Sequence, residues 1–224
     1  MIALSNFKGM SCYVLESEAI RAVVIPELGA KIASLCWKPT GREWLIDSQS
    51  RPFGKVEYGS TFTDADLSGW DECFPTIDAC RYPRSGAYDG RPIPDHGEVW
   101  SLAWRAEPSD DALTCRVEGV ALPYRLIRRM ALAGEDGLKL TYRAENTGDE
   151  PIAVMWTAHP MFAVRPDTEI RLPAGVDRLL CVHGGARFAR GTSYAWPEAI
   201  DRTGRALRID RIGPRENRDS RKWF

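Results

Sequence analysis

The pattern of apolar and polar positions along the chain predicts a series of short β-strands. Apolar or alternating runs recur at close spacing, and turns containing Gly and Pro separate them. Residues 113–120 and 138–146 alternate apolar and polar side chains, which is typical of strands with one solvated face. The other runs that predict strands are 11–16, 19–25, 32–37, 43–46, 98–107, 124–132, 152–159, 168–172, 178–183 and 206–209. No helix of convincing length is indicated, so the predicted fold class is antiparallel all-β.

The run at residues 152–159 differs from the others because it is apolar at almost every position. Such a run is expected of a strand that is covered on both faces. By period two, His159 shares a face with Thr157 and Met155. Pro160 follows at once and prevents the strand from continuing with a paired amide.

Residues 47–95 are rich in Gly, Pro, Asp and Ser and have little periodic pattern. A connection this long is usually functional or disordered, and its many aromatic residues argue against disorder. We therefore predict ordered loops and short strands that line one end of the sheet. Five acidic residues gather in the middle of this region, but their spacing does not match a calcium-binding loop, and no metal site is predicted. They are Asp64, Asp66, Asp71, Glu72 and Asp78.

Length and composition narrow the class of protein. A chain of 224 residues with 44% hydrophobic and 27% charged residues fits a single domain over residues 1–224, or at a stretch two small ones. The net charge of -1 gives no electrostatic case for nucleic acid or an anionic membrane as partner. No signal peptide or membrane-spanning run is evident, so a cytoplasmic location is predicted. The six cysteines lack metal-ligand spacing and are expected to be reduced and mostly buried.

Histidine and tryptophan supply the candidate chemistry. The chain has three histidines, of which His96 follows a Pro-Asp loop, His159 ends the apolar run and His183 precedes two glycines. Histidine suits proton transfer near neutral pH, and we hypothesise that the strands bring His96 and His159 to one site. The alternative is that each is a half-buried structural histidine. Eight tryptophans and seven tyrosines offer flat faces that suit a sugar, although most are expected to be core or rim residues.

Four segments, in order over about residues 20 to 165, together resemble the aldose 1-epimerase family. The first is similar to an opening hairpin of the type Gly-Ala-x-Ile-x-Ser-Leu, and the second to a loop of uncharacterised members. The third and fourth are similar to the segments that carry the two active-site histidines. The segments are 28–35, 69–75, 86–88 with 94–97, and 145–151 with 157–162.

This resemblance implies an antiparallel β-supersandwich of the galactose mutarotase type, with a sugar as ligand and neither cofactor nor metal. In the family, a carboxylate takes the proton from the anomeric hydroxyl of a hexose and a histidine protonates the ring oxygen. The ring opens, the C1–C2 bond rotates and the ring closes again, so the α and β anomers interconvert. Carried over by motif, His159 is the general acid and His96 a second donor near the ring oxygen.

The resemblance also suggests substrate-binding residues. An arginine before the first histidine holds a sugar hydroxyl in the family, and Arg81 and Arg84 are both candidates that spacing does not separate. Trp70 and Trp156 are candidate sugar-facing aromatics, and Asp71 beside Trp70 is a further candidate.

Two departures from the family pattern are evident. Family members generally run some tens of residues further, and their base is a glutamate in that later part. No carboxylate in residues 1–224 is framed like it, although Glu198 and Glu216 are nearby acids. The family's sugar-binding aspartate also lacks a secure match. The chain is thus expected to be a truncated form, an incomplete sequence or a member without the base. A non-catalytic carbohydrate-binding module and a structural β-sandwich interaction domain remain the competing hypotheses.

Overall fold

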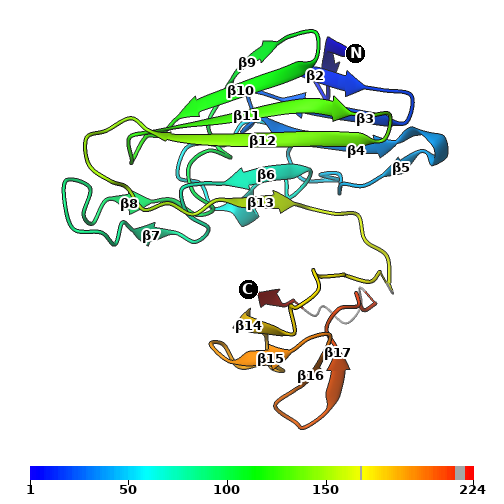
Figure 1. The fold of residues 1–224 in the computed structure, drawn as a ribbon, viewed down its shortest axis with the longest axis vertical. Helices are drawn as coiled ribbons and strands as arrows, with labels where there is room; N and C mark the ends of the chain where they lie inside the picture. The colour runs from blue at the N-terminus through cyan, green and yellow to red at the C-terminus, as the bar shows by residue number, and fades with distance from the viewer. Residues whose placement is uncertain (167, 215–219) are drawn as a thin grey trace. The chain divides into compact units, whose positions relative to one another are not determined.

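The computed structural model describes residues 1–166, 168–214 and 220–224, and Figure 1 shows its fold. Glu216 lies outside the described residues. The chain divides into two compact units, unit 1 at Met1–Ala163 and unit 2 at Val164–Phe224.

Unit 1 contains an antiparallel seven-stranded sheet. Its strand order is β1-β2-β3-β4-β6-β13, and β5 pairs with β4. β6 lies in the middle of the long loop region and brings that region into the sheet. The strands are β1 (Ile2–Phe7), β2 (Met10–Glu16), β3 (Ile20–Ile25), β4 (Lys31–Trp37), β5 (Arg42–Glu43), β6 (Trp70–Cys73) and β13 (Thr157–Pro160).

A four-stranded antiparallel sheet forms the second layer of unit 1, in the order β12-β11-β10-β9. Side chains on β10 alternate between buried and exposed, as the sequence pattern predicts for a strand with one solvated face. One hydrophobic core holds residues of both sheets, among them Leu15, Ile32, Leu113 and Leu126. The strands are β9 (Arg105–Pro108), β10 (Ala112–Glu118), β11 (Tyr124–Ala133) and β12 (Gly137–Asn146).

The loop region of unit 1 is ordered, as predicted. Besides β6, it contains the two-stranded hairpin of β7 (Cys80–Arg81) and β8 (Pro92–Ile93). The only helical elements among the described residues are two 3₁₀ turns, η1 (Lys38–Thr40) and η2 (Phe62–Asp64). No described helix is long and apolar enough to cross a membrane.

Unit 2 consists of short strands around a small core. Three of them form a sheet in the order β15-β14-β18, and β16 pairs with β17. Its core holds Cys181, Phe188, Ala199 and Ile209. The strands are β14 (Arg178–His183), β15 (Ser193–Ala195), β16 (Glu198–Ile200), β17 (Ala206–Arg208) and β18 (Lys222–Trp223).

The all-β prediction is confirmed, and three local predictions are wrong. Residues 98–104 form turns instead of the first part of a strand, because the indole N–H groups of Trp100 and Trp104 bind the carbonyl oxygens of Asp95 and Val99. The run 168–172 forms no strand. The run 152–159 becomes a strand only at Thr157, and its residues 153–156 are exposed instead of covered on both faces.

The chemistry of the cysteines agrees with the prediction. All six are free, and Cys12, Cys73, Cys115 and Cys181 are buried. Burial raises the pKa of the Cys115 thiol to about 11, so this thiol is un-ionised at neutral pH.

Candidate active site

His96 and His159 lie side by side in unit 1. Their ring centroids are 5.0 Å apart in an edge-to-face arrangement. Phe62, from η2, is stacked on His96 at 4.3 Å and meets His159 edge to face at 4.9 Å. Three segments that are distant in the sequence therefore meet at one aromatic cluster, and the hypothesis that the fold brings these two imidazoles together agrees with the geometry.

A backbone hydrogen bond and an unusual backbone conformation hold the loop that carries His96 in place. The His96 amide donates to the Ile77 carbonyl, and His96 has a positive φ of 59°. Gly97 follows with φ 75°, and a Cβ there would overlap the Phe74 carbonyl. Only glycine fits this close approach, and a left-handed histidine is the kind of backbone strain that collects at functional sites.

Asp95 orients the His96 ring. Its Oδ1 lies 2.9 Å from His96 Nδ1, and its Oδ2 accepts the Phe62 amide at 2.9 Å. An ionised carboxylate only accepts hydrogen bonds, so Nδ1 carries the proton of the neutral ring. Nε2 is then the nitrogen left with a lone pair for a ligand. Asp95 thus fixes the tautomer of His96, and by binding both residues it holds the His96 ring beside Phe62.

His159 is placed by strand pairing. It lies on β13 directly opposite Asp71 on β6. Residues opposite each other in an antiparallel pair project to the same face of the sheet. Asp71 and His159 therefore share one face, and His159 is half-buried while Asp71 is 1% exposed.

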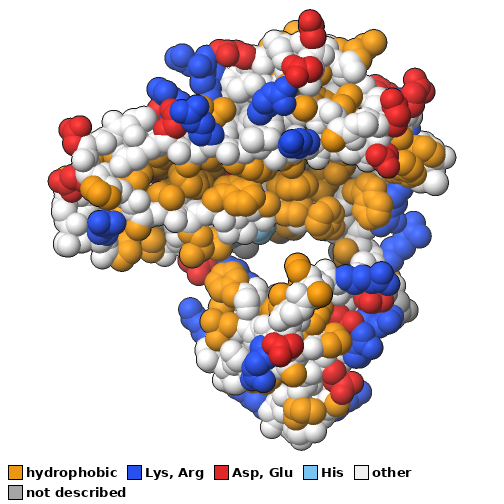
Figure 2. Space-filling view, viewed as in Figure 1, with side chains coloured by type: hydrophobic (Ala, Val, Ile, Leu, Met, Phe, Trp, Pro, Cys, Tyr) orange, Lys and Arg blue, Asp and Glu red, His pale blue; other side chains and the backbone are white. Residues whose placement is uncertain are grey.

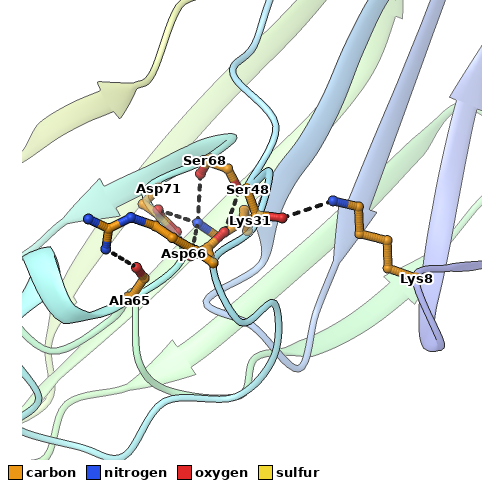
Figure 3. A network of polar contacts seen from close by, with 8 residues as sticks. Lys8, Lys31, Ser48, Ala65, Asp66, Ser68 and Asp71 are labelled. Atoms are coloured by element: carbon orange, nitrogen blue, oxygen red, sulfur yellow. Dashed lines mark hydrogen bonds and ion pairs between the residues drawn. The ribbon is translucent and has the colours of Figure 1, made fainter.

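A buried ion cluster holds Asp71 (Figure 3). The Lys31 ammonium donates to Asp71 Oδ2 at 2.6 Å, to the Ser68 carbonyl at 2.8 Å and to Asp66 Oδ1 at 3.2 Å. Burial raises the pKa of Asp71 to about 6, against the lowering effect of Lys31. Burial lowers the pKa of Lys31, but Asp71 and Asp66 outweigh it and hold that pKa above its usual value. Lys31 therefore stays charged at neutral pH.

The adjacent residue on β6, Glu72, points the other way and joins the two sheets. It is fully buried, and its Oε1 accepts from Arg128 of β11 at 2.9 Å and from the Tyr142 hydroxyl of β12 at 2.7 Å. Its Oε2 accepts the Trp156 indole N–H at 2.9 Å. The negative charge raises the pKa of Tyr142, together with the larger effect of burial.

The predicted substrate-binding residues are more scattered than the histidines. Trp70 alternates with Asp71 along β6 and packs against the core between the sheets, and the Trp156 indole reaches Glu72 on that side. Both tryptophans thus lie on the opposite face of the large sheet from His159. Arg81 donates to the Gly90 carbonyl within the β7–β8 hairpin, and Arg84 is exposed in the connection between these strands. The roles of these residues in sugar binding stay predictions.

Sequence reasoning missed Phe62, Asp95 and Lys31 as parts of the site. Asp95 had a signal, because it precedes His96 directly. Phe62 lies in a stretch without periodic pattern. Lys31 follows a turn, and its buried partners Asp66 and Asp71 lie 35 and 40 residues further along the chain.

Comparison with known proteins identifies a matching family and solved structures with a similar fold. Residues 11–187 match the model of the family described as aldose 1-epimerase. No curated protein sequence matches. Among solved structures, the Slr1438 protein from Synechocystis sp. PCC 6803 is similar at 18% identity and a TM-score of 0.56, and the alignment covers 84% of this chain and 67% of that one.

Two further structures share the fold. A galactose mutarotase-like protein from Clostridium acetobutylicum is 14% identical with a TM-score of 0.54, covering 91% of this chain and 65% of that one. A TPR-domain containing protein from Parabacteroides distasonis is 16% identical with a TM-score of 0.58, covering 84% of this chain and 28% of that one. This chain therefore spans about two-thirds of the first two structures and a smaller part of the third.

Proposed function

Because the chain belongs to the aldose 1-epimerase family, we propose that it binds a hexose at the His96–His159 pair and interconverts its α and β anomers. The observation that carries this proposal is the 5.0 Å separation of the two imidazole rings. Opening the sugar ring requires a proton to leave the anomeric hydroxyl and another to reach the ring oxygen. Both oxygens are bonded to C1, so two adjacent imidazoles suit a single bound sugar.

His159 acts as the general acid. It donates a proton to the ring oxygen as the C1–O bond to that oxygen breaks, and the anomeric carbon becomes the carbonyl carbon of the open chain. After rotation about the C1–C2 bond the same steps run in reverse, so His159 recovers its proton. The His159 side chain projects from a paired strand, and a paired strand holds a catalytic side chain in position more precisely than a loop does.

His96 takes a different part in this scheme from the second donor that the family resemblance implies. With its Nδ1 proton held by Asp95, the neutral ring has its acceptor at Nε2. That form suits removal of the proton from the anomeric hydroxyl. Asp95 acts through His96 and is a positioning residue, in the way that a carboxylate orients the base in a catalytic triad.

The experiment follows the anomers of freshly dissolved α-D-glucose and α-D-galactose by polarimetry or proton NMR. We expect the chain to accelerate equilibration and His159→Ala and His96→Ala to lose about a hundred- to ten-thousand-fold of that acceleration. His183→Ala is the matched control and should keep full activity. Equal rates for the chain, His159→Ala and buffer would refute the enzymatic proposal. Sugar-dependent tryptophan fluorescence in that case would favour the alternative, a carbohydrate-binding module without catalysis.

A further inference from the structure

A row of three side chains crosses the large sheet of unit 1. Ile32 of β4 lies opposite Trp70 of β6. The next positions along these antiparallel strands are Lys31 and Asp71, whose ammonium and carboxylate groups are in contact. His159 of β13 lies opposite Asp71 on the other side of β6. Lys31, Asp71 and His159 therefore stand side by side on one face of the sheet, with Asp71 in the middle.

The ion cluster around Lys31 contains more negative than positive charge. Figure 2 shows charged side chains of both signs on the surface of unit 1, where water screens them. Lys31, Asp66 and Asp71 are instead at most 5% exposed. One ammonium group and two carboxylates leave a negative charge in excess at a place that water hardly reaches. Buried charges in proteins are nearly always paired, so this cluster lacks a second cation.

Asp71 is the member of the cluster that can accept this second cation. Its Oδ2 accepts from Lys31 at 2.6 Å, whereas its Oδ1 is buried and has no hydrogen-bond partner among the described residues. Both oxygens of Asp66 accept hydrogen bonds, one from Lys31 and one from the Ser68 hydroxyl. A buried acceptor without a donor is costly, so the unmet demand of the cluster is at Asp71 Oδ1.

His159 is placed to supply the missing cation. The Cβ atoms of directly opposed residues in an antiparallel pair are about 4.5–5.5 Å apart. At such a spacing a carboxylate stabilises the charged form of an imidazole. The attraction is stronger in the interior of a protein than at its surface, because the effective dielectric constant is lower there.

The other charged groups near His159 have less influence on it. They are at least partly exposed, so water screens their charges. A proton on the adjacent His96 ring would repel a proton on His159, so the two rings compete for one positive charge. The exposed acids are Asp95, whose side chain is 27% exposed, Asp64 of η2, and Asp47, which pairs with Lys8.

We propose that Asp71 is a positioning residue that holds the proton of the histidine pair on His159, so that the His159 imidazolium completes the Lys31 cluster. A general acid at His159 and a general base at His96 require this distribution of the proton. Asp71 thus acts through His159, which differs from the direct sugar contact that the family resemblance suggests. The catalytic part of this inference rests on the proposed function, whereas the position of the proton does not.

The test is NMR spectroscopy of the full chain labelled with ¹⁵N, in which the imidazole nitrogens of the three histidines are followed against pH. His159→Ala identifies the resonances of His159. Asp71→Asn keeps the shape of the side chain and removes its charge, and we expect it to lower the titration midpoint of His159 by about one pH unit or more. Asp66→Asn should lower the midpoint by less, because it removes the same charge from the far side of Lys31.

The matched control is Asp47→Asn, which removes an exposed carboxylate and should leave the His159 midpoint unchanged. Activity supplies a second measurement. The alkaline limb of the pH profile of kcat/KM should move to lower pH in Asp71→Asn by the same amount as the His159 midpoint, because the general acid must keep its proton.

Two results would overturn the proposal. One is a His159 midpoint that Asp71→Asn moves no further than Asp47→Asn does, and the other is a midpoint that rises in Asp71→Asn. If circular dichroism shows that Asp71→Asn does not fold, Asp66→Asn decides, and an unchanged midpoint in that variant overturns the proposal as well. A chain that does not interconvert anomers would refute the proposed function and leave the titration readable, so the two failures are distinguishable.

Discussion

Replacing Lys31 by methionine tests the role of the buried ion cluster in holding β6 and the site. The change keeps the length of the side chain and removes its charge, so Asp66 and Asp71 lose their common cation. Lys31 is 2% exposed and Asp71 is 1% exposed, and water therefore cannot replace the lost partner. Leaving one member of a buried ion pair without the other costs about 3–5 kcal/mol, and we expect unit 1 to lose this much free energy of unfolding near neutral pH.

The pH dependence gives the prediction its specific signature. The pKa of Asp71 is about 6 in the intact protein, and removing Lys31 takes away an influence that lowers it. Asp71 is then protonated over a wider range in the variant, and the uncompensated charge disappears in acid. The destabilisation should therefore shrink by about 1–2 kcal/mol between neutral pH and about pH 5, since one pKa unit corresponds to roughly 1.4 kcal/mol.

The assay is urea unfolding followed by tryptophan fluorescence at both pH values. Lys8→Met is the matched control, because Lys8 pairs with the exposed Asp47. Lys8 also donates to the hydroxyl of Ser48, as Figure 3 shows. A surface pair is worth about 1 kcal/mol or less, so this control should change little. A loss below about 1 kcal/mol in Lys31→Met, or a loss that does not depend on pH, would refute the reasoning.

Two further predictions concern Asp71 and Asp95. The folded pKa of Asp71 lies above its ordinary value of 3.8, so the native state binds a proton that the unfolded chain releases, and stability falls as pH rises through the window from about 4 to about 6. The free energy of unfolding of the intact chain should lose about 2 kcal/mol more than that of Asp71→Asn over this window, as measured by urea unfolding, and parallel pH profiles would contradict this. Asp95→Asn should lower the rate of anomer interconversion about a hundredfold or more with little change in the KM, because the amide no longer fixes the tautomer of His96. An unchanged rate, measured by polarimetry, would remove Asp95 from the mechanism.

The sequence predicts the regular part of the fold well because period-two alternation is a local property. The runs that form β10 and β12 alternate apolar and polar residues, and the structure has these strands and β11 within two residues of the predicted bounds. The strand predicted over residues 98–107 fails because Trp100 and Trp104 imitate a strand pattern while their indole groups close turns on backbone carbonyls. Side-chain hydrogen bonds of this kind leave no periodic signature.

The two histidines were predictable from the order of short motifs, whereas their surroundings were not. Lys31 has the sequence context of an ordinary turn lysine, and only the fold shows that two aspartates surround it. Met155 shows the reverse case, because its apolar context predicts burial and the fold leaves it exposed. Its amide binds the Pro75 carbonyl in a loop, so the segment is ordered without a neighbouring strand that would cover it.

The two neighbouring acids of β6 have a consequence for folding. Asp71 meets Lys31 on one face of the sheet, and Glu72 meets Arg128 on the other. If β6 slipped by one residue, only one of the two cations would still face a carboxylate, and the other would face Trp70 or Cys73. A buried cation without its partner is costly, so the two ion pairs together oppose a misaligned strand. The adjacent acids therefore fix the alignment of β6 as well as joining it to its neighbours.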